Sequence, residues 1–173
     1  PGNARPEKIP SLRAAFKKDG TITAANSSSI SDGGAALILM SESKAKEQGL
    51  TPLCKIVAHS THSQKPSEFT VAPVGAMNSV LEKAGWTTAD VDLWEINEAF
   101  AMVTMLAIDE LKLDESKVNV NGGACALGHP IGASGARILV TLIHALKNRG
   151  LKKGIASLCI GGGEAVAMAV EAY

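Results

Sequence analysis

The sequence predicts an α/β fold: a mixed, mostly parallel sheet with helices on both faces. Two observations support this prediction. After residue 50, apolar runs of strand length alternate with longer segments of helical apolar spacing, and glycines stand where those helices should end. Such alternation favours right-handed crossovers between parallel strands. The expected order of elements is βαβαβαββ.

Each element follows from its own pattern. We expect strands at 53–59, 91–96, 117–121, 154–160 and 164–173, and helices at 72–85, 98–113 and 135–150. Three glycines join the last two strands, so the final strand should run antiparallel, at one side of the sheet. Residues 1–50 contain a β-prone piece, a loop of asparagine and serines, the run ALILM and a polar helix before Gly49. We interpret 1–50 as the tail of a preceding unit and 51–173 as the main domain.

Composition excludes several classes of function. The 173 residues carry 17 Lys and Arg against 17 Asp and Glu, so no basic surface for nucleic acid or an anionic membrane is predicted. No apolar run reaches the roughly 18 residues of a membrane span. The three cysteines form no CxxC pair, which favours a reducing, cytoplasmic location. The chain opens on proline instead of methionine, and we interpret it as a processed or truncated product.

Polar chemistry gathers at three predicted strand ends. Asn97 follows the strand at 91–96, the loop GGACALGHPIGASG follows the strand at 117–121, and Cys159 lies at the end of the strand at 154–160. In open α/β sheets, ligands bind beyond the carboxyl ends of the parallel strands. We therefore expect Asn97, His129 and Cys159 to lie around one cavity.

Each of these residues has a catalytic and a structural interpretation. The proline after His129 holds the histidine backbone out of the helical region, and nearby glycines allow a ligand to approach, although a solvent-facing turn histidine is the alternative. Cys159 precedes three glycines whose N–H groups could stabilise an oxyanion, and its thiol could exchange protons with a histidine. The alternative for Cys159 is a buried structural thiol. Asn97 could bind a water or a carbonyl, or simply cap a helix.

Other motifs are weak. The loop around His129 has neither the GxGxxG nor the GxxxxGK[ST] spacing of a phosphate-binding loop. His59 and His62 form an HxxH pair without a third ligand, so we predict a solvated loop and no metal site.

Four segments in order, NSSSISDGGAALILMSE, WEINEAFA, NVNGGACALGHPIGASGAR and LCIGGGEA, together resemble the C-terminal half of the thiolase family. Within the family the chain is most similar to the biosynthetic type, acetyl-CoA C-acetyltransferase. The resemblance implies that residues 1–50 end the N-terminal thiolase domain and that residues 51–173 form the C-terminal one. It also implies a reversible Claisen condensation of two acetyl-CoA molecules to acetoacetyl-CoA and free CoA.

The resemblance further implies residue roles. Cys159 of CxGGG is the acid/base, His129 of GHP activates the nucleophilic thiol, and Asn97 of NEAF holds a water in an oxyanion hole. Gly161 donates its N–H to a second oxyanion hole. The residues expected along the pantetheine arm are Ser28, Ala99 and Phe100. The substrates are coenzyme A thioesters with no further cofactor, and the full-length protein is expected to be a homodimer or homotetramer.

Two departures and two alternatives accompany the resemblance. Glu164 and Cys125 replace more usual residues, and Glu164 could raise the pKa of the nearby thiol or face outward. The nucleophilic cysteine of the family belongs to the N-terminal half, so this chain alone is predicted to be an inactive acyltransferase fragment. The alternatives are a degradative 3-ketoacyl-CoA thiolase and a non-catalytic module for CoA binding or assembly.

Overall fold

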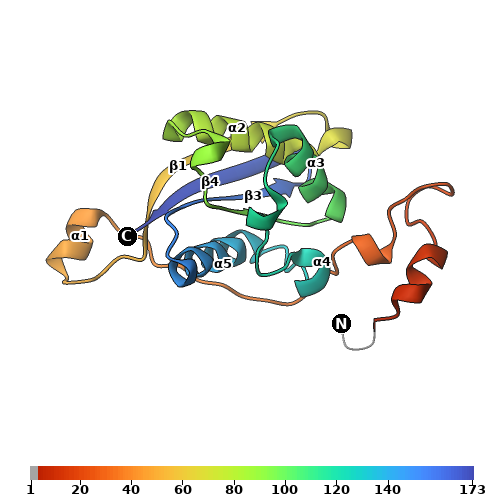
Figure 1. Cartoon of the computed structure of the whole chain (residues 1–173), viewed down its shortest axis with the longest axis horizontal. Coiled ribbons are helices and arrows are strands. Elements are labelled where there is room, and N and C mark those ends of the chain that lie inside the picture. Colours follow the sequence, from red (N-terminus) through yellow and green to blue (C-terminus); the bar gives the residue numbers. More distant parts are fainter. Residues whose placement is uncertain (1–3) are drawn as a thin grey trace.

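The computed structural model describes residues 4–173, so only the first three residues of the predicted 1–50 segment lie outside it. Within this range one mixed sheet has the strand order β1-β4-β3-β2 (Figure 1). Strands β1, β2 and β3 run in one direction, and β4 opposes them between β1 and β3. The elements are α1 (Glu42–Glu47), β1 (Cys54–Ser63), α2 (Ala72–Ala84), β2 (Leu93–Ile96), α3 (Ala101–Leu111), α4 (Ala124–Leu127), α5 (Ser134–Arg149), β3 (Lys153–Ile160) and β4 (Glu164–Ala172). Short 3-10 turns lie at Pro6–Ser11, Ala24–Asn26, Pro66–Glu68, Thr88–Asp90 and Glu115–Lys117.

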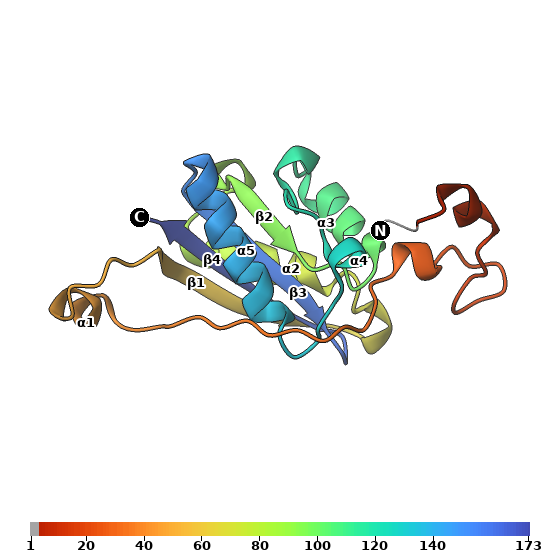
Figure 2. The ribbon, with the colours of Figure 1, turned by 90° about the horizontal axis from the view of Figure 1, so that it is seen from below.

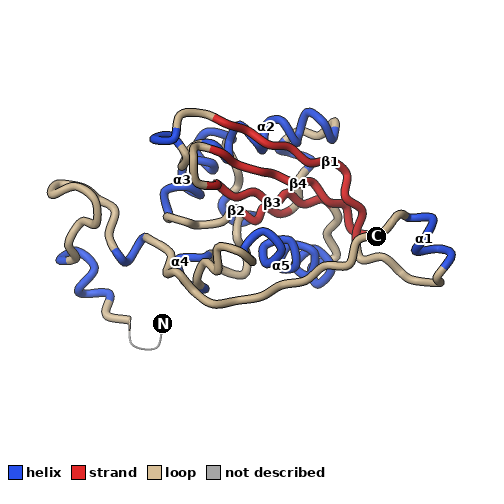
Figure 3. The backbone as a smooth tube through the Cα atoms, turned by 180° about the vertical axis from the view of Figure 1, so that it is seen from behind, coloured by secondary structure: helices blue, strands red, loops and turns tan. Residues whose placement is uncertain are grey.

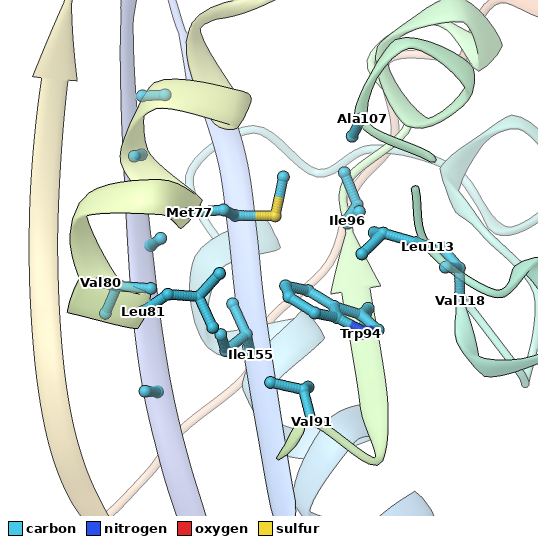
Figure 4. Packing of buried hydrophobic residues seen from close by; sticks show 14 of the residues in the cluster. Met77, Val80, Leu81, Val91, Trp94, Ile96, Ala107, Leu113, Val118 and Ile155 are labelled. Carbon is cyan, nitrogen blue, oxygen red and sulfur yellow. The ribbon is translucent and has the colours of Figure 1, made fainter. Parts of the chain in front are cut away.

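Helices cover both faces of the sheet, as Figures 1 and 2 show. Helices α2 and α3 pack on one face around Trp94, Ile96 and Ile155. The close-up in Figure 4 shows Met77 of α2 pointing toward Ile96, and Ile155 lying beside Leu81 and Trp94. Helix α5 covers the other face, where every third or fourth residue is buried against the sheet. The contact is close, because a Cβ on Gly154 of β3 would lie 2.8 Å from Leu142 of α5.

The α/β fold class and the helices on both faces are confirmed, but two details of the topology were wrong. The last strand is antiparallel as expected, yet β4 lies inside the sheet because β1 pairs with its outer edge. Residues 117–121 form no strand, and Val118 makes only an isolated bridge to Trp94. His59 and His62 also lie on strand β1, not in a loop.

Residues 4–50 form an arm that runs along the α5 side of the sheet to α1 and then enters β1 (Figures 2 and 3). The arm has no strand of its own in the described residues, although Ser27 and Ile30 form isolated bridges to Phe100 and His129. Its ALILM run is exposed, with Ile38 90% accessible. Among residues 4–173, no helix combines the length and the apolar character needed to cross a bilayer.

Candidate active site

Asn97 stands where β2 ends, and its position is fixed from the neighbouring strand. Its backbone N–H donates to Ser157 O of β3 at 2.9 Å. The side chain is 1% exposed, and Nδ2 lies 3.3 Å from Nε2 of His129. Two residues that are 32 positions apart in sequence therefore meet in a hydrogen bond. Their proximity was expected, but His129 follows helix α4 and not the strand from which it was predicted.

His129 is held through both its backbone and its ring. The backbone N–H donates to Ser29 O at 3.0 Å, and the ring Nδ1 lies 2.6 Å from Ser134 Oγ. The Ser134 hydroxyl donates to Pro130 O at 3.0 Å, so its oxygen accepts from Nδ1–H. This arrangement assigns the proton to Nδ1 and leaves Nε2 as the acceptor that faces the Asn97 amide.

The surroundings of His129 favour its neutral form. Burial, and then the positive charge of Arg137, lower the pKa of His129 below its ordinary value. A neutral imidazole whose Nε2 is an acceptor is able to take a proton from a thiol that replaces the Asn97 amide as its partner. The site therefore presents a base and an amide side by side.

The three residues predicted to line the pantetheine arm also come together. Ser28 donates both its N–H, at 3.1 Å, and its hydroxyl, at 3.0 Å, to Ala99 O. The bridge between Ser27 and Phe100 continues this contact. The N-terminal arm, residues 4–50, thus passes directly beside the NEAF and GHP segments. A hollow of about 370 Å³ opens between residues 31–35 of this arm and residues 130–136.

Cys159 lies two residues beyond Ser157 on β3, and its side chain is 9% exposed. Burial raises the pKa of its thiol. Among the described residues its thiol makes no hydrogen bond to His129 or Asn97. The Cys159 side chain belongs to the apolar cluster under α2 and α3, so the structure joins two of the three predicted residues directly and not the third. Gly161 is exposed in the turn that follows, and Glu164 is exposed and faces outward.

Close backbone packing requires one of the three glycines in the turn after Cys159. Gly163 has φ 91°, and a Cβ there would overlap the backbone carbonyl of Gln64. The backbone N–H of Gln64 donates to Gly163 O at 2.9 Å, which keeps the two backbones close. Only glycine fits this position without strain.

Two residues that hold the site were not found from the sequence. Ser134 fixes the His129 ring, as described above. Asn119, at φ 47°, replaces the missing strand: its Oδ1 accepts from Ile96 N at 2.8 Å, and its Nδ2 donates to Ile96 O at 2.9 Å. An asparagine side chain can imitate a backbone amide and tolerates positive φ, so the VNVN pattern carried this signal.

The other two cysteines are poor nucleophiles. Burial and the nearby Glu98 carboxylate raise the pKa of Cys125 to about 11, and burial raises the pKa of Cys54. All three cysteines are free thiols. Within residues 4–173, no group of three or more His, Cys, Asp or Glu side chains could hold a metal ion.

Comparison with known families agrees with this fold. The family model described as "Thiolase, C-terminal domain" matches residues 50–172, and "Thiolase, N-terminal domain" matches residues 2–43. The chain belongs to the thiolase family, as predicted, and the family is one of acyltransferase enzymes.

Individual relatives are similar over almost the whole chain. It is 55% identical over 165 residues to acetyl-CoA acetyltransferase of Thiocystis violacea, which covers 95% of this chain and 42% of that protein. A crystal structure of Bacillus anthracis acetyl-CoA acetyltransferase has a TM-score of 0.97 at 53% identity, covering 100% of this chain and 44% of that one. Human mitochondrial 3-ketoacyl-CoA thiolase in complex with CoA has a TM-score of 0.92 at 43% identity, with the same coverage. The chain thus spans less than half the length of these relatives.

Proposed function

We propose that this chain is the C-terminal part of an acetyl-CoA C-acetyltransferase that condenses two acetyl-CoA molecules, reversibly, to acetoacetyl-CoA and CoA. The hydrogen-bonded series Asn97–His129–Ser134 carries the proposal. It presents a neutral base and an amide where β2 ends, and β2 neighbours β3, the strand that bears Cys159. The similarity to acetyl-CoA acetyltransferases supports this choice of reaction.

In the proposed reaction, His129 Nε2 takes the proton of a nucleophilic cysteine that belongs to the N-terminal half. That thiolate attacks the carbonyl carbon of one acetyl-CoA, and the CoA thiolate leaves and takes the proton of the Cys159 thiol, which becomes a thiolate while His129 stays protonated. The Cys159 thiolate then removes a proton from the methyl group of a second acetyl-CoA. A raised pKa makes this thiolate, once formed, a stronger base.

The resulting enolate attacks the acetyl group on the nucleophile. A carbon–carbon bond forms, the carbon–sulfur bond to the nucleophile breaks, and the released thiolate recovers a proton through His129. Asn97, through a water, and the N–H of Gly161 stabilise the negative oxygens, which is where catalysis gains most. Ser28, Ala99 and Phe100 lie along the pantetheine arm. Protons and electrons balance without any further cofactor.

The proposal also assigns the chain to two domains and the nucleophilic cysteine to a part outside it. Residues 1–50 end the N-terminal thiolase domain, and residues 51–173 form the C-terminal domain. Since neither Cys54 nor Cys125 is a suitable nucleophile, we expect the 173-residue chain alone to be inactive. The full-length protein is proposed to be a homodimer or homotetramer, and the cytoplasmic location stays a prediction.

Fragment complementation tests the proposal. The chain is mixed with the N-terminal part of Bacillus anthracis acetyl-CoA acetyltransferase, and CoA-dependent cleavage of acetoacetyl-CoA is measured. We expect no activity from either part alone, activity from the pair, and at least about a 100-fold loss with His129→Ala or Asn97→Ala. Asn148→Ala, at the far end of α5, is the matched control. Normal rates from the chain alone, or full activity of both variants, would refute the proposal.

A degradative 3-ketoacyl-CoA thiolase is the second candidate, favoured by the similarity to the human mitochondrial enzyme. The two differ in the length of acyl chain that they accept. The same complemented pair, assayed with acetoacetyl-CoA and with longer 3-ketoacyl-CoA substrates, separates them. Faster cleavage of the longer substrates would favour the degradative enzyme.

A further inference from the structure

One carboxylate joins the two loops that carry the candidate site. Glu98 follows Asn97 directly in the NEAF segment, and its Oε2 accepts the backbone N–H of Cys125 at 3.0 Å. The Cys125 thiol also lies 3.9 Å from Glu98 O, so the same two residues meet twice. Cys125 belongs to α4, the helix that leads into Gly128 and His129. Glu98 therefore links the loop of Asn97 to the loop of His129, across 27 positions of sequence.

The start of α4 is built around this carboxylate. Gly123 occupies the N-cap position of α4 and offers no side chain to cap it. A Cβ on Gly123 would overlap the Glu98 carboxylate, so glycine leaves the space that the carboxylate fills. The first N–H groups of a helix have no partner inside the helix, and Glu98 supplies one for Cys125. The NEAF segment thus caps a helix that belongs to the other loop.

Hydrogen bonds continue from this cap to the backbone of His129. The N–H of Gly128 donates to Ala124 O at 2.8 Å, which closes the single turn of α4. His129 follows directly, so a displacement of the first residues of α4 moves the histidine with it. On the other side, the N–H of Asn97 is bound to Ser157 O of β3. Glu98 therefore holds α4 against a fixed strand end.

We propose that Glu98 is a positioning residue that sets the distance between the Asn97 amide and the His129 imidazole. The inference rests on the proposed function, because it gives Glu98 a role in the same reaction. Asn97 Nδ2 and His129 Nε2 are 3.3 Å apart, and this separation depends on the length of the side chain that bridges their loops. A hydrogen bond to an ionised acceptor is about twice as strong as a neutral one, so a carboxylate holds α4 more firmly than an amide would.

Two substitutions separate the length of the Glu98 side chain from its charge. Glu98→Gln keeps the length and an acceptor oxygen but loses the charge, whereas Glu98→Asp keeps the charge on a side chain one methylene shorter. The measurement is the ¹⁵N shifts of His129 Nε2 and Asn97 Nδ2 in the 173-residue chain, at a pH where the ring is neutral. Both shifts should stay near the original values in Glu98→Gln and should move toward those of unpaired groups in Glu98→Asp.

Two further measurements should follow the same order of variants. The Cys125 amide should exchange with solvent at least about 10-fold faster in Glu98→Asp than in the original chain. The complemented enzyme should lose about 10- to 100-fold in rate in Glu98→Asp and Glu98→Ala, and about fivefold at most in Glu98→Gln. Gly123→Ala should also move the two ¹⁵N shifts, because its Cβ displaces the carboxylate while Glu98 itself is kept.

Asp92→Ala is the matched control. The Asp92 carboxylate accepts the N–H groups of Lys152 and Lys153, at 2.9 and 2.8 Å, and so joins two segments at the opposite end of β2. Its loss should leave the His129 and Asn97 shifts unchanged. Original shifts in Glu98→Asp together with displaced shifts in Glu98→Gln would overturn the positioning role, as would shifts in every test variant equal to those of the control.

Two arrangements keep the test decisive. If Glu98→Asp does not fold, Gly123→Ala takes its place, since its extended backbone, with φ −111° and ψ −179°, accommodates alanine. Unchanged shifts in Gly123→Ala would then overturn the role. The NMR readout needs no turnover, so a complemented pair without activity would refute the proposed function, whereas the shifts alone decide the role of Glu98.

Discussion

Ser134→Ala tests whether His129 is held in one tautomer. Ser134 is fully buried, and its hydroxyl accepts from His129 Nδ1 at 2.6 Å. Pro130 O would lose the Ser134 hydroxyl but keep the N–H groups of Ala133 and Ser134, each at 2.8 Å. In Ser134→Ala, the His129 Nδ1–H is therefore the only group left without a hydrogen-bond partner among these three residues. A buried N–H without a partner costs about 1–3 kcal/mol, which corresponds to a roughly 5- to 150-fold shift in the tautomer or rotamer equilibrium.

The measurement is the pair of ¹⁵N shifts of the His129 ring at a pH where it is neutral. In the original chain Nδ1 should carry the proton, whereas Ser134→Ala should show a substantial Nε2–H population, and the complemented enzyme should lose about 5- to 150-fold in rate. Ser60→Ala is the matched control, since the buried Ser60 hydroxyl donates to Ala76 O at 2.7 Å away from the site. An unchanged tautomer in Ser134→Ala would refute the assignment of Ser134.

Three predictions concern stability, measured by urea unfolding. Asn119→Ala should lose about 2–4 kcal/mol, because two side-chain hydrogen bonds disappear and alanine is strained at positive φ, while Asn119→Gly should lose about 1 kcal/mol less. Gly163→Ala should lose at least about 2 kcal/mol through overlap with the 64–65 backbone, whereas Gly161→Ala, which has open space, should be nearly neutral. Because the folded-state pKa of Glu95 is raised to about 7 from 4.5, stability should be greatest below the unfolded value and fall by about 3 kcal/mol as pH rises through this window. Glu95→Gln should flatten that slope; equal slopes would contradict the raised pKa.

The periodicity of apolar residues predicted where helices and strands lie better than it predicted which strands pair with each other. Helices α2 and α5 bury one face at helical spacing, and the glycine turn required β3 and β4 to be adjacent and antiparallel. Nothing in the local pattern says which strand pairs with the other edge of β4, since that depends on long-range packing. The strand expected at 117–121 failed because Asn119 satisfies the end of β2 with its side chain.

The site was predictable where chemistry and strand ends coincide. Asn97 followed from that rule, because it stands directly after β2. His129 was expected beside it for a reason that failed, since residues 117–121 form no strand. The structure nevertheless brings Asn97 to His129, and Ser28 to Ala99 as the family resemblance implied. Glu95 looked like an ordinary residue of the strand. Its burial depends on α5, which lies some forty positions later, so no local pattern could identify it.

The boundary between the two predicted units does not separate the site from the arm. Ser29 O accepts from the His129 N–H, and Ser28 donates to Ala99 O, so a short piece of the N-terminal arm contacts both loops of the candidate site. Backbone hydrogen bonds of this kind do not depend on side-chain identity. They nevertheless fix the position of the His129 backbone and of the NEAF segment just before α3. The arm is therefore part of the machinery that orients His129. Any displacement of this arm will shift His129 and the NEAF segment together, because residues 28 and 29 hydrogen-bond to both loops.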